Sequence, residues 1–237
     1  MTQRKTRLEE STLILEGSRA INTLLEHRLS YASIEKIVCT PCFDRALLSA
    51  NTAEQIEIEK TLFEKLSDVD QSQGVMALVR YESPQLEDRL TYNKLLLIEN
   101  MRDPGNLGTL IRSAAGAGYD GILLYGQHVD ETNPKVIRSS LGHFFTQPMY
   151  ACNHAQLNKL LEQGTLISLV CDKGSPLYAY KKTAPFILAV GSEAHGLSEE
   201  LLSITDEYLT IPLESTCESL NAAVAASIAM YAPNLQG

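Results

Sequence analysis

The chain has 237 residues, of which 44% are hydrophobic and 21% are charged. A length of this order suits one large domain or two small ones. No apolar run approaches the ~20 residues that span a bilayer, and the N-terminal segment has basic side chains without the apolar core of a secretory signal. The composition therefore excludes a membrane-spanning chain and predicts a cytoplasmic globular protein.

The charge balance is acidic: 20 Lys and Arg face 29 Asp and Glu, for a formal net charge of −9. A nucleic-acid-binding protein is expected to carry a basic surface, but net charge does not describe a single face. Any contact with a nucleic acid must therefore use local clusters, each of which by itself is most simply a group of solvated charges. The candidates are Arg4, Lys5 and Arg7, then Lys135 and Arg138, then Lys181 and Lys182.

The five cysteines are scattered along the chain and odd in number, which argues against a disulfide framework. Cys39 and Cys42 form one C-x-x-C pair, but no second Cys or His pair at similar spacing completes a zinc site. We therefore predict two ordinary thiols near a strand end and no metal.

The first third of the chain predicts a small α/β domain. Hydrophobic periodicity and Gly or Pro punctuation predict strands over 12–15, 34–39 and 74–81, and helices over 17–27, 43–50 and 53–66. The polar stretch 82–92, which contains Pro84, marks a boundary. We predict a first domain over 1–85, a linker over 86–92 and a second domain over 93–237.

The second domain alternates strands with helices, which predicts a mainly parallel sheet covered on both faces. The expected strands are 94–99, 121–125, 166–171, 186–190 and 208–211, and the expected helices are 109–117, 134–141, 154–163 and a final helix of small apolar residues around 222–229. Ser219 and Asn221 are both suitable caps for the last helix.

Two of these strands end in loops with little side-chain bulk. The buried run 186–190 stops at Gly191-Ser192-Glu193 and is followed by Gly196, and the run 208–211 ends at Pro212. Open α/β sheets bind ligands at the carboxyl ends of their strands, and glycine lets backbone approach a ligand closely. Taken alone, this pattern is also that of ordinary strand-to-helix turns.

Three sequence blocks decide between these interpretations. They are Asn106–Arg112 (NLGTLIR), Gly191–Gly196 (GSEAHG), and Ile211-Pro212 followed by Ser219-Leu220-Asn221. In this order they resemble the SpoU-type branch of the SPOUT methyltransferases, which move a methyl group from S-adenosylmethionine to a ribose 2′-hydroxyl of RNA. The resemblance covers about the last 145 residues well and the first 85 loosely.

The resemblance implies a fold that periodicity would not propose. The family's parallel α/β sheet ends in a deep trefoil knot, here built from the loops after Val190 and Ile211 and the helix from Ser219; knots are very rare among folds. The segment LEGSRAINTLLEH is similar to the ribosomal-protein-like, substrate-binding domain that often precedes such a catalytic domain. The family also implies a homodimer formed through the knotted region, and the apolar helix 221–231 offers a suitable face.

The resemblance also assigns catalytic residues. Arg112 matches the arginine that helps the 2′-hydroxyl react, either as base or by stabilising the alkoxide; a guanidinium pKa above ~12 favours the second role. Asn106, expected in a loop before the helix, shapes the site, and Glu193 is placed to orient Arg112 through a charge-assisted pair. Ser219 and Asn221 match residues that hold the ribose or the arginine, and capping of the last helix is compatible with that role.

The implied cofactor is S-adenosylmethionine, held largely through backbone atoms. The positions that match or adjoin its contacts are Ala189, Gly191, Ile211, Pro212 and Leu220. Leu213 and Ser215 stand where many members have Met and Gly, which leaves the exact substrate open. We interpret His195 as a loop residue.

The N-terminal domain favours ribosomal RNA as substrate over transfer RNA. An RNA-binding module without catalysis is a further alternative, although the asparagine, arginine and glutamate positions are all occupied. A nucleotide-binding oxidoreductase is disfavoured, since the glycine-rich segment 116–121 follows a predicted helix rather than a strand.

Overall fold

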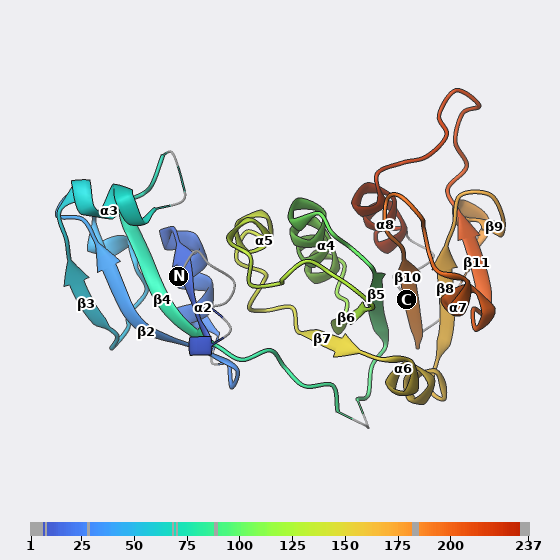
Figure 1. Ribbon diagram of the computed structural model, residues 1–237, viewed down its shortest axis with the longest axis horizontal. Coiled ribbons are helices and arrows are strands. Elements are labelled where there is room, and N and C mark those ends of the chain that lie inside the picture. The colour runs from blue at the N-terminus through green and yellow to red at the C-terminus, as the bar shows by residue number, and fades with distance from the viewer. Residues whose placement is uncertain are drawn as a thin grey trace. The chain divides into compact units, whose positions relative to one another are not determined.

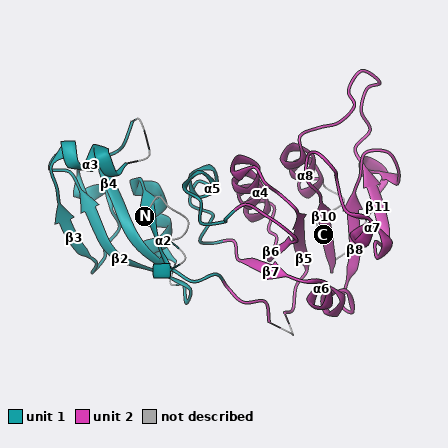
Figure 2. Cartoon of the chain, in the orientation of Figure 1, with its two compact units in different colours: residues 1–83, 130–146 teal, residues 84–129, 147–237 magenta. Residues whose placement is uncertain are grey.

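The computed structural model describes residues 7, 9–27, 29–67, 69, 71–87, 90–181 and 185–232. The chain forms two compact units, one of residues 1–83 with 130–146 and one of 84–129 with 147–237 (Figure 2). The sequence predicts contiguous domains, whereas the contacts group 130–146 with the first unit. No helix among the described residues is both long enough and apolar enough to cross a bilayer.

The first unit is built on a four-stranded sheet in the order β1-β4-β2-β3. Its strands are β1 (Thr12–Glu16), β2 (Ala32–Cys39), β3 (Glu54–Glu57) and β4 (Val75–Tyr81). β4 pairs antiparallel with β1 and β2, and β2 pairs parallel with β3. The helices are α2 (Ser18–Glu26), α3 (Lys60–Leu66) and α5 (Pro134–Ser139).

Two helices predicted in this unit are wrong. The segment 43–50 contains only a 3₁₀ turn, Arg45–Leu47, capped by the Asp44 side chain. The segment 53–66 begins as β3, and only its second half is the helix α3. The reason is the alternation EQIEIE over 54–59, a period of two with β-branched isoleucine, which suits an extended strand paired to β2.

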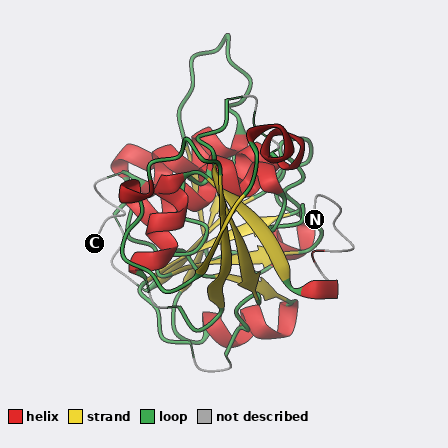
Figure 3. Ribbon diagram, turned by 90° about the vertical axis from the view of Figure 1, so that its left-hand side faces the viewer, coloured by secondary structure: helices red, strands yellow, loops and turns green. Residues whose placement is uncertain are grey.

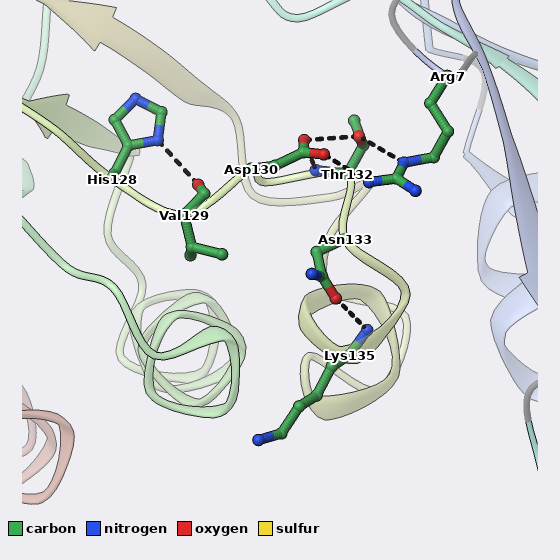
Figure 4. Close-up of polar contacts among 7 residues, drawn as sticks. All are labelled: Arg7, His128, Val129, Asp130, Thr132, Asn133 and Lys135. Carbon is green, nitrogen blue, oxygen red and sulfur yellow. Dashed lines mark hydrogen bonds and ion pairs between the residues drawn. The ribbon is translucent and has the colours of Figure 1, made fainter. Parts of the chain in front are cut away.

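The N-terminal segment and the segment before α5 are joined by a buried ion pair (Figure 4). Arg7 lies 2.5 Å from Asp130, and its Nε donates to the Thr132 hydroxyl at 3.2 Å. Burial by itself raises the pKa of the Asp130 carboxyl, but hydrogen bonds from Thr132 and Arg7 outweigh it and hold that pKa below its usual range. Arg7, one of the predicted RNA-binding candidates, is therefore a buried structural residue; Arg4, Lys5 and Lys182 lie outside the described residues.

The second unit is built on a seven-stranded sheet in the order β7-β6-β5-β10-β8-β11-β9 (Figure 1). Its strands are β5 (Lys94–Glu99), β6 (Gly121–Tyr125), β7 (Met149–Cys152), β8 (Thr165–Leu169), β9 (Ser175–Pro176), β10 (Phe186–Val190) and β11 (Glu207–Thr210). All strand pairs in it are parallel, which confirms the predicted parallel α/β sheet. The central strands β5 and β10 are almost wholly buried, as their continuous apolar runs indicate.

The helices of the second unit are α4 (Pro104–Gly116), α6 (His154–Leu161), α7 (Glu199–Ser203) and α8 (Ala222–Met230). β7, β9 and α7 are absent from the elements predicted above, because each is too short to show a clear period in the sequence. The predicted helix 109–117 begins five residues after the first residue of α4. The helix starts at Pro104 because the Asp103 carboxylate accepts the N–H of Asn106 at 2.8 Å, so Asn106 lies in the first helical turn and not in a loop.

Candidate functional site

The candidate site lies at the carboxyl edge of the parallel sheet, where β5 and β10 are neighbours. Val190 is paired with Ile98, so both strands end at the same place. From there β5 leads into the first turn of α4, while β10 leads into the glycine-bounded loop 191–198. Because parallel strands present their carboxyl ends together, two of the motif blocks meet here.

Asn106 joins all three motif blocks through its side-chain amide. Its Nδ2 donates to the Glu193 carboxylate, and its Oδ1 accepts a hydrogen bond from the Asn221 amide at 3.2 Å. Asn221 is in turn the N-cap of α8, since its Oδ1 accepts the N–H groups of Ala223 and Val224. Three predicted site residues, far apart in the chain, thus form one hydrogen-bonded group.

The loop 191–198 folds tightly back on itself. The backbones of Ser192 and Gly196 exchange two hydrogen bonds, of 3.1 and 2.9 Å. A Cβ placed on Gly191 would lie 2.0 Å from the Gly196 carbonyl carbon, so no side chain fits there. Gly196 has a φ of +63°, but a Cβ on it would meet nothing within 4 Å. The first glycine is required by close approach and the second by backbone conformation.

A buried carboxylate holds the far end of this loop. Glu99, the last residue of β5, is 2% exposed and accepts the Ser198 N–H at 2.7 Å. Ser198 also caps α7 through its hydroxyl. Acidic side chains are almost never buried without a partner. The position of Glu99 at the end of an apolar run is therefore a sequence signal for a site residue. Glu99 and Ser198 extend the set of residues that shape the site.

Arg112 lies on α4 and is exposed, and no hydrogen bond or ion pair among the described residues joins its side chain to this group. It is six residues beyond Asn106, which in a helix corresponds to ~9 Å along the axis and ~120° around it. Among the described residues its guanidinium makes no ion pair with Glu193, so the expected Arg112–Glu193 pair is absent. The partner of the Glu193 carboxylate is the Asn106 amide instead. The next residue, Ser113, shares a hydrogen bond of 2.8 Å with Ser227, which joins α4 to α8.

The remaining predicted residues divide between the sheet and the third block. Ala189 and Gly191 are buried at the end of β10. Ile211, Pro212, Ser219 and Leu220 lie on the long loop between β11 and α8, which projects beyond the strands (Figures 1 and 3). Ser219 is exposed on this loop and does not cap α8. His195 is exposed within the loop 191–198.

Two family models match the chain, one for each part of it. Residues 93–231 match the SpoU rRNA methylase family, and residues 1–77 match an MRM3-like substrate binding domain. The first match spans more than half of the sequence. The chain belongs to the SpoU rRNA methylase family. The resemblance predicted from the three sequence blocks is thereby confirmed.

Individual SpoU-type proteins are similar over almost the whole chain. The 23S rRNA (guanosine(2553)-2′-O)-methyltransferase RlmP of Bacillus subtilis is 31% identical over 231 residues, 96% of this chain and 90% of the relative. A 23S rRNA (uridine(2479)-2′-O)-methyltransferase of Streptomyces viridochromogenes is 28% identical over 249 residues, 96% and 84% of the two chains.

Solved structures agree with these relatives. The SpoU methyltransferase AviRb from Streptomyces viridochromogenes, in complex with its cofactor AdoMet, matches with a TM-score of 0.82 at 26% identity, over 97% of this chain and 92% of that one. The similarity therefore includes the SpoU domain and the N-terminal domain together. A parallel α/β domain preceded by a substrate-binding domain is confirmed.

Proposed function

We propose that this SpoU-family protein transfers a methyl group from S-adenosylmethionine to a ribose 2′-hydroxyl of ribosomal RNA. The observation that carries the proposal is the Asn106 amide, which joins Glu193 and Asn221 at the carboxyl edge of β5 and β10. This group uses one residue from each motif block. The full-length similarity to ribosomal RNA 2′-O-methyltransferases supports the choice of reaction and of substrate class.

The residues at this edge fit the cofactor. The bound sulfonium supplies an electrophilic methyl group, so the protein has to provide position and charge. Gly191 brings two backbone segments together, Gly196 faces open space and Glu193 offers a carboxylate suited to a cation. We assign cofactor contacts to Ala189, Gly191, Ile211, Pro212 and Leu220, with the loop 211–221 closing over the site and the C-terminal segment threaded as a trefoil knot.

Catalysis requires a charge near the attacking oxygen, because a neutral alcohol is a poor nucleophile. We assign this to the exposed guanidinium of Arg112, which stabilises the developing alkoxide rather than removing its proton. The hydroxyl proton passes to solvent water, the ribose oxygen gains the methyl group, and S-adenosylhomocysteine leaves as a neutral thioether. Asn106 and Glu193 hold the first turn of α4 and the loop 191–198 in register with each other. Ser219 and Asn221 hold the ribose.

We propose that the active form is a homodimer that uses α8. Val224, Ile228 and Tyr231, spaced along one side of this helix, are 47, 44 and 49% exposed. An apolar stripe of this kind is typical of an interface. Burying this stripe against a second copy would remove its apolar side chains from water, on the helix that carries Asn221 at its N-terminus.

The test is a transfer assay with the purified protein. Tritiated S-adenosylmethionine and total RNA from cells lacking the gene are incubated with it, and the label is mapped by resistance of the adjacent phosphodiester to alkaline hydrolysis. We expect label at one ribose of ribosomal RNA. Label in transfer RNA would support the alternative substrate, and binding of RNA without transfer would support a catalytically silent RNA-binding module.

A further inference from the structure

The first unit contains a cavity that the methyl-transfer site does not use. Its volume is about 360 Å³, within the ~300–1,000 Å³ range of ligand pockets, and the described residues that line it all belong to this unit. Its walls are mainly aliphatic: Ile14 and Leu15 of β1, Ala20 of α2, Leu66, Ile137 of α5 and Leu141. The cavity thus lies where β1 and α2 meet the segment 130–146.

This segment is fixed firmly against the rest of the unit. Gly142 has a φ of +92°, a conformation that side chains rarely adopt, and a Cβ on it would lie 2.9 Å from the Thr23 hydroxyl oxygen. The Arg7–Asp130 ion pair holds the other end of the segment (Figure 4). The cavity is therefore preformed.

Leu141 is an unusual wall residue. Its φ is +50°, a left-handed conformation that bulky side chains rarely adopt, and it is 41% exposed at the cavity. An asparagine would adopt this conformation more easily and would suit the exposure. The strained backbone therefore places an apolar side chain on the cavity wall, at a position where a polar one would be favoured locally.

The described residues of the lining carry both signs of charge. They include three arginines (7, 19 and 138) and one glutamate (16). Arg7 is neutralised by Asp130, and the Glu16 carboxylate accepts hydrogen bonds from the Ser67 and Ser72 hydroxyls. Arg19 on α2 and Arg138 on α5 are exposed and make no ion pair with other described residues.

We propose that this cavity binds one unstacked nucleotide of the RNA substrate. The base lies against the aliphatic walls and Leu141, and the flanking phosphates are bound by Arg19 and Arg138. Sequence-specific RNA recognition uses unpaired bases splayed out of the strand, and the planar guanidinium fork matches phosphate oxygens. Two arginines at the rim favour RNA over an apolar side chain of a protein partner. The proposal rests on the proposed function, because it names a second contact to the same RNA.

The first test is electrostatic and uses the full chain. Affinity for a fluorescein-labelled, 20-nucleotide single-stranded RNA of mixed sequence is measured by anisotropy over a range of salt concentrations. Each phosphate contact in a single strand contributes ~0.7 to the slope of log affinity against log salt. We expect Arg19→Gln/Arg138→Gln to lower the slope by about 1.4. The control, Lys36→Gln, removes a charge that is 44% exposed and paired with Glu54 on β3, and should leave the slope almost unchanged.

The second test removes the apolar wall without a change of charge. Leu141→Asn relieves the strain of the left-handed backbone. We therefore expect the stability against unfolding and the affinity for the cofactor to be unchanged or higher. RNA should bind about fivefold more weakly at an unchanged salt slope. A lowered slope together with this loss supports the nucleotide site. If the double arginine variant lowers the salt slope but Leu141→Asn binds RNA like the unmodified protein, the proposal that a base occupies the cavity is wrong.

The outcomes separate this proposal from the proposed function. If the unmodified protein transfers no methyl group to RNA, the proposed function fails. If it transfers methyl groups and binds RNA, but both variants bind RNA like the unmodified protein, only the cavity assignment is overturned and a protein partner becomes the better occupant.

Discussion

Asn106 and Glu193, 87 residues apart in the chain, are joined by a hydrogen bond from the asparagine amide to the carboxylate. One residue lies in the first turn of α4 and the other in the loop after β10. The contact therefore ties together the segments that follow two adjacent parallel strands. Glu193 is held by an amide and not by Arg112, which leaves the guanidinium available to the substrate.

This relationship predicts a rescue by exchange. Asn106→Asp places two carboxylates side by side, so the loop 191–198 should move and single-turnover methyl transfer should slow by about 10²-fold, the effect of a displacement near 1 Å. Adding Glu193→Gln restores an amide–carboxylate pair in the opposite direction and should recover part of the rate. A double variant slower than both single variants would show that the contact has no positioning role.

Arg112→Ala should abolish methyl transfer while cofactor affinity, measured by calorimetry, survives. The expected loss is roughly 10²–10⁴-fold, the usual contribution of a group that assists proton loss. Arg112→Lys keeps the charge without the planar fork and should give an intermediate rate. Turnover of Arg112→Ala close to that of the unmodified enzyme would remove this residue from the mechanism.

The two glycines of the loop 191–198 should respond differently to alanine. Gly191→Ala introduces a Cβ 2.0 Å from the backbone of Gly196, so the loop must open, and S-adenosylmethionine affinity should fall by about 5- to 150-fold through overpacking of ~1–3 kcal/mol. Gly196→Ala meets open space and bears only the left-handed cost of ~1–2 kcal/mol. Calorimetry measures the S-adenosylmethionine affinity of both variants. A larger loss of affinity for Gly196→Ala than for Gly191→Ala would contradict the geometry.

The apolar stripe of α8 should determine the oligomeric state. Ile228→Glu introduces a charge into the proposed interface and should convert the dimer to a monomer at micromolar concentration in sedimentation velocity. Leu62→Glu is the matched control, since Leu62 on α3 is exposed to a similar degree, 49% against 44%. A monomeric unmodified protein would contradict the proposal directly.

The Arg7–Asp130 pair should make the first unit sensitive to acid. The folded pKa of Asp130 lies below its ordinary value near ~3.9, so its contribution to stability is complete above that pH and is lost as pH falls through the lower folded value. Asp130→Asn should make the stability of the first unit less dependent on pH in the acid range. Hydrogen exchange of the backbone amides in α5 measures this dependence. Arg7→Met leaves a buried carboxylate without this partner and should cost ~3–5 kcal/mol, part of which Arg7→Met/Asp130→Asn regains.

Most elements of the second unit could be predicted from the amino-acid pattern alone. Continuous apolar runs such as 186–190 predict buried parallel strands because both faces of such a strand are covered, and the three motif blocks predict which loops meet. Prediction of helices and strands from the sequence failed where the hydrophobic pattern of a segment was short or ambiguous. The segment 53–66 mixes a period of two with a helix, and β7 and α7 are too brief for either period to show.

The contacts between side chains of different elements follow from three-dimensional packing and not from the amino-acid pattern. The register of β10 on β5 places Glu193 against Asn106, and the Asp103 cap places Asn106 inside α4, so Arg112 lies farther along and around the helix. Glu99, Arg7 and the segment 130–146 acquire their roles from contacts across the chain that no spacing predicts. Periodicity reports which face of an element is buried, whereas partner choice depends on how the elements pack.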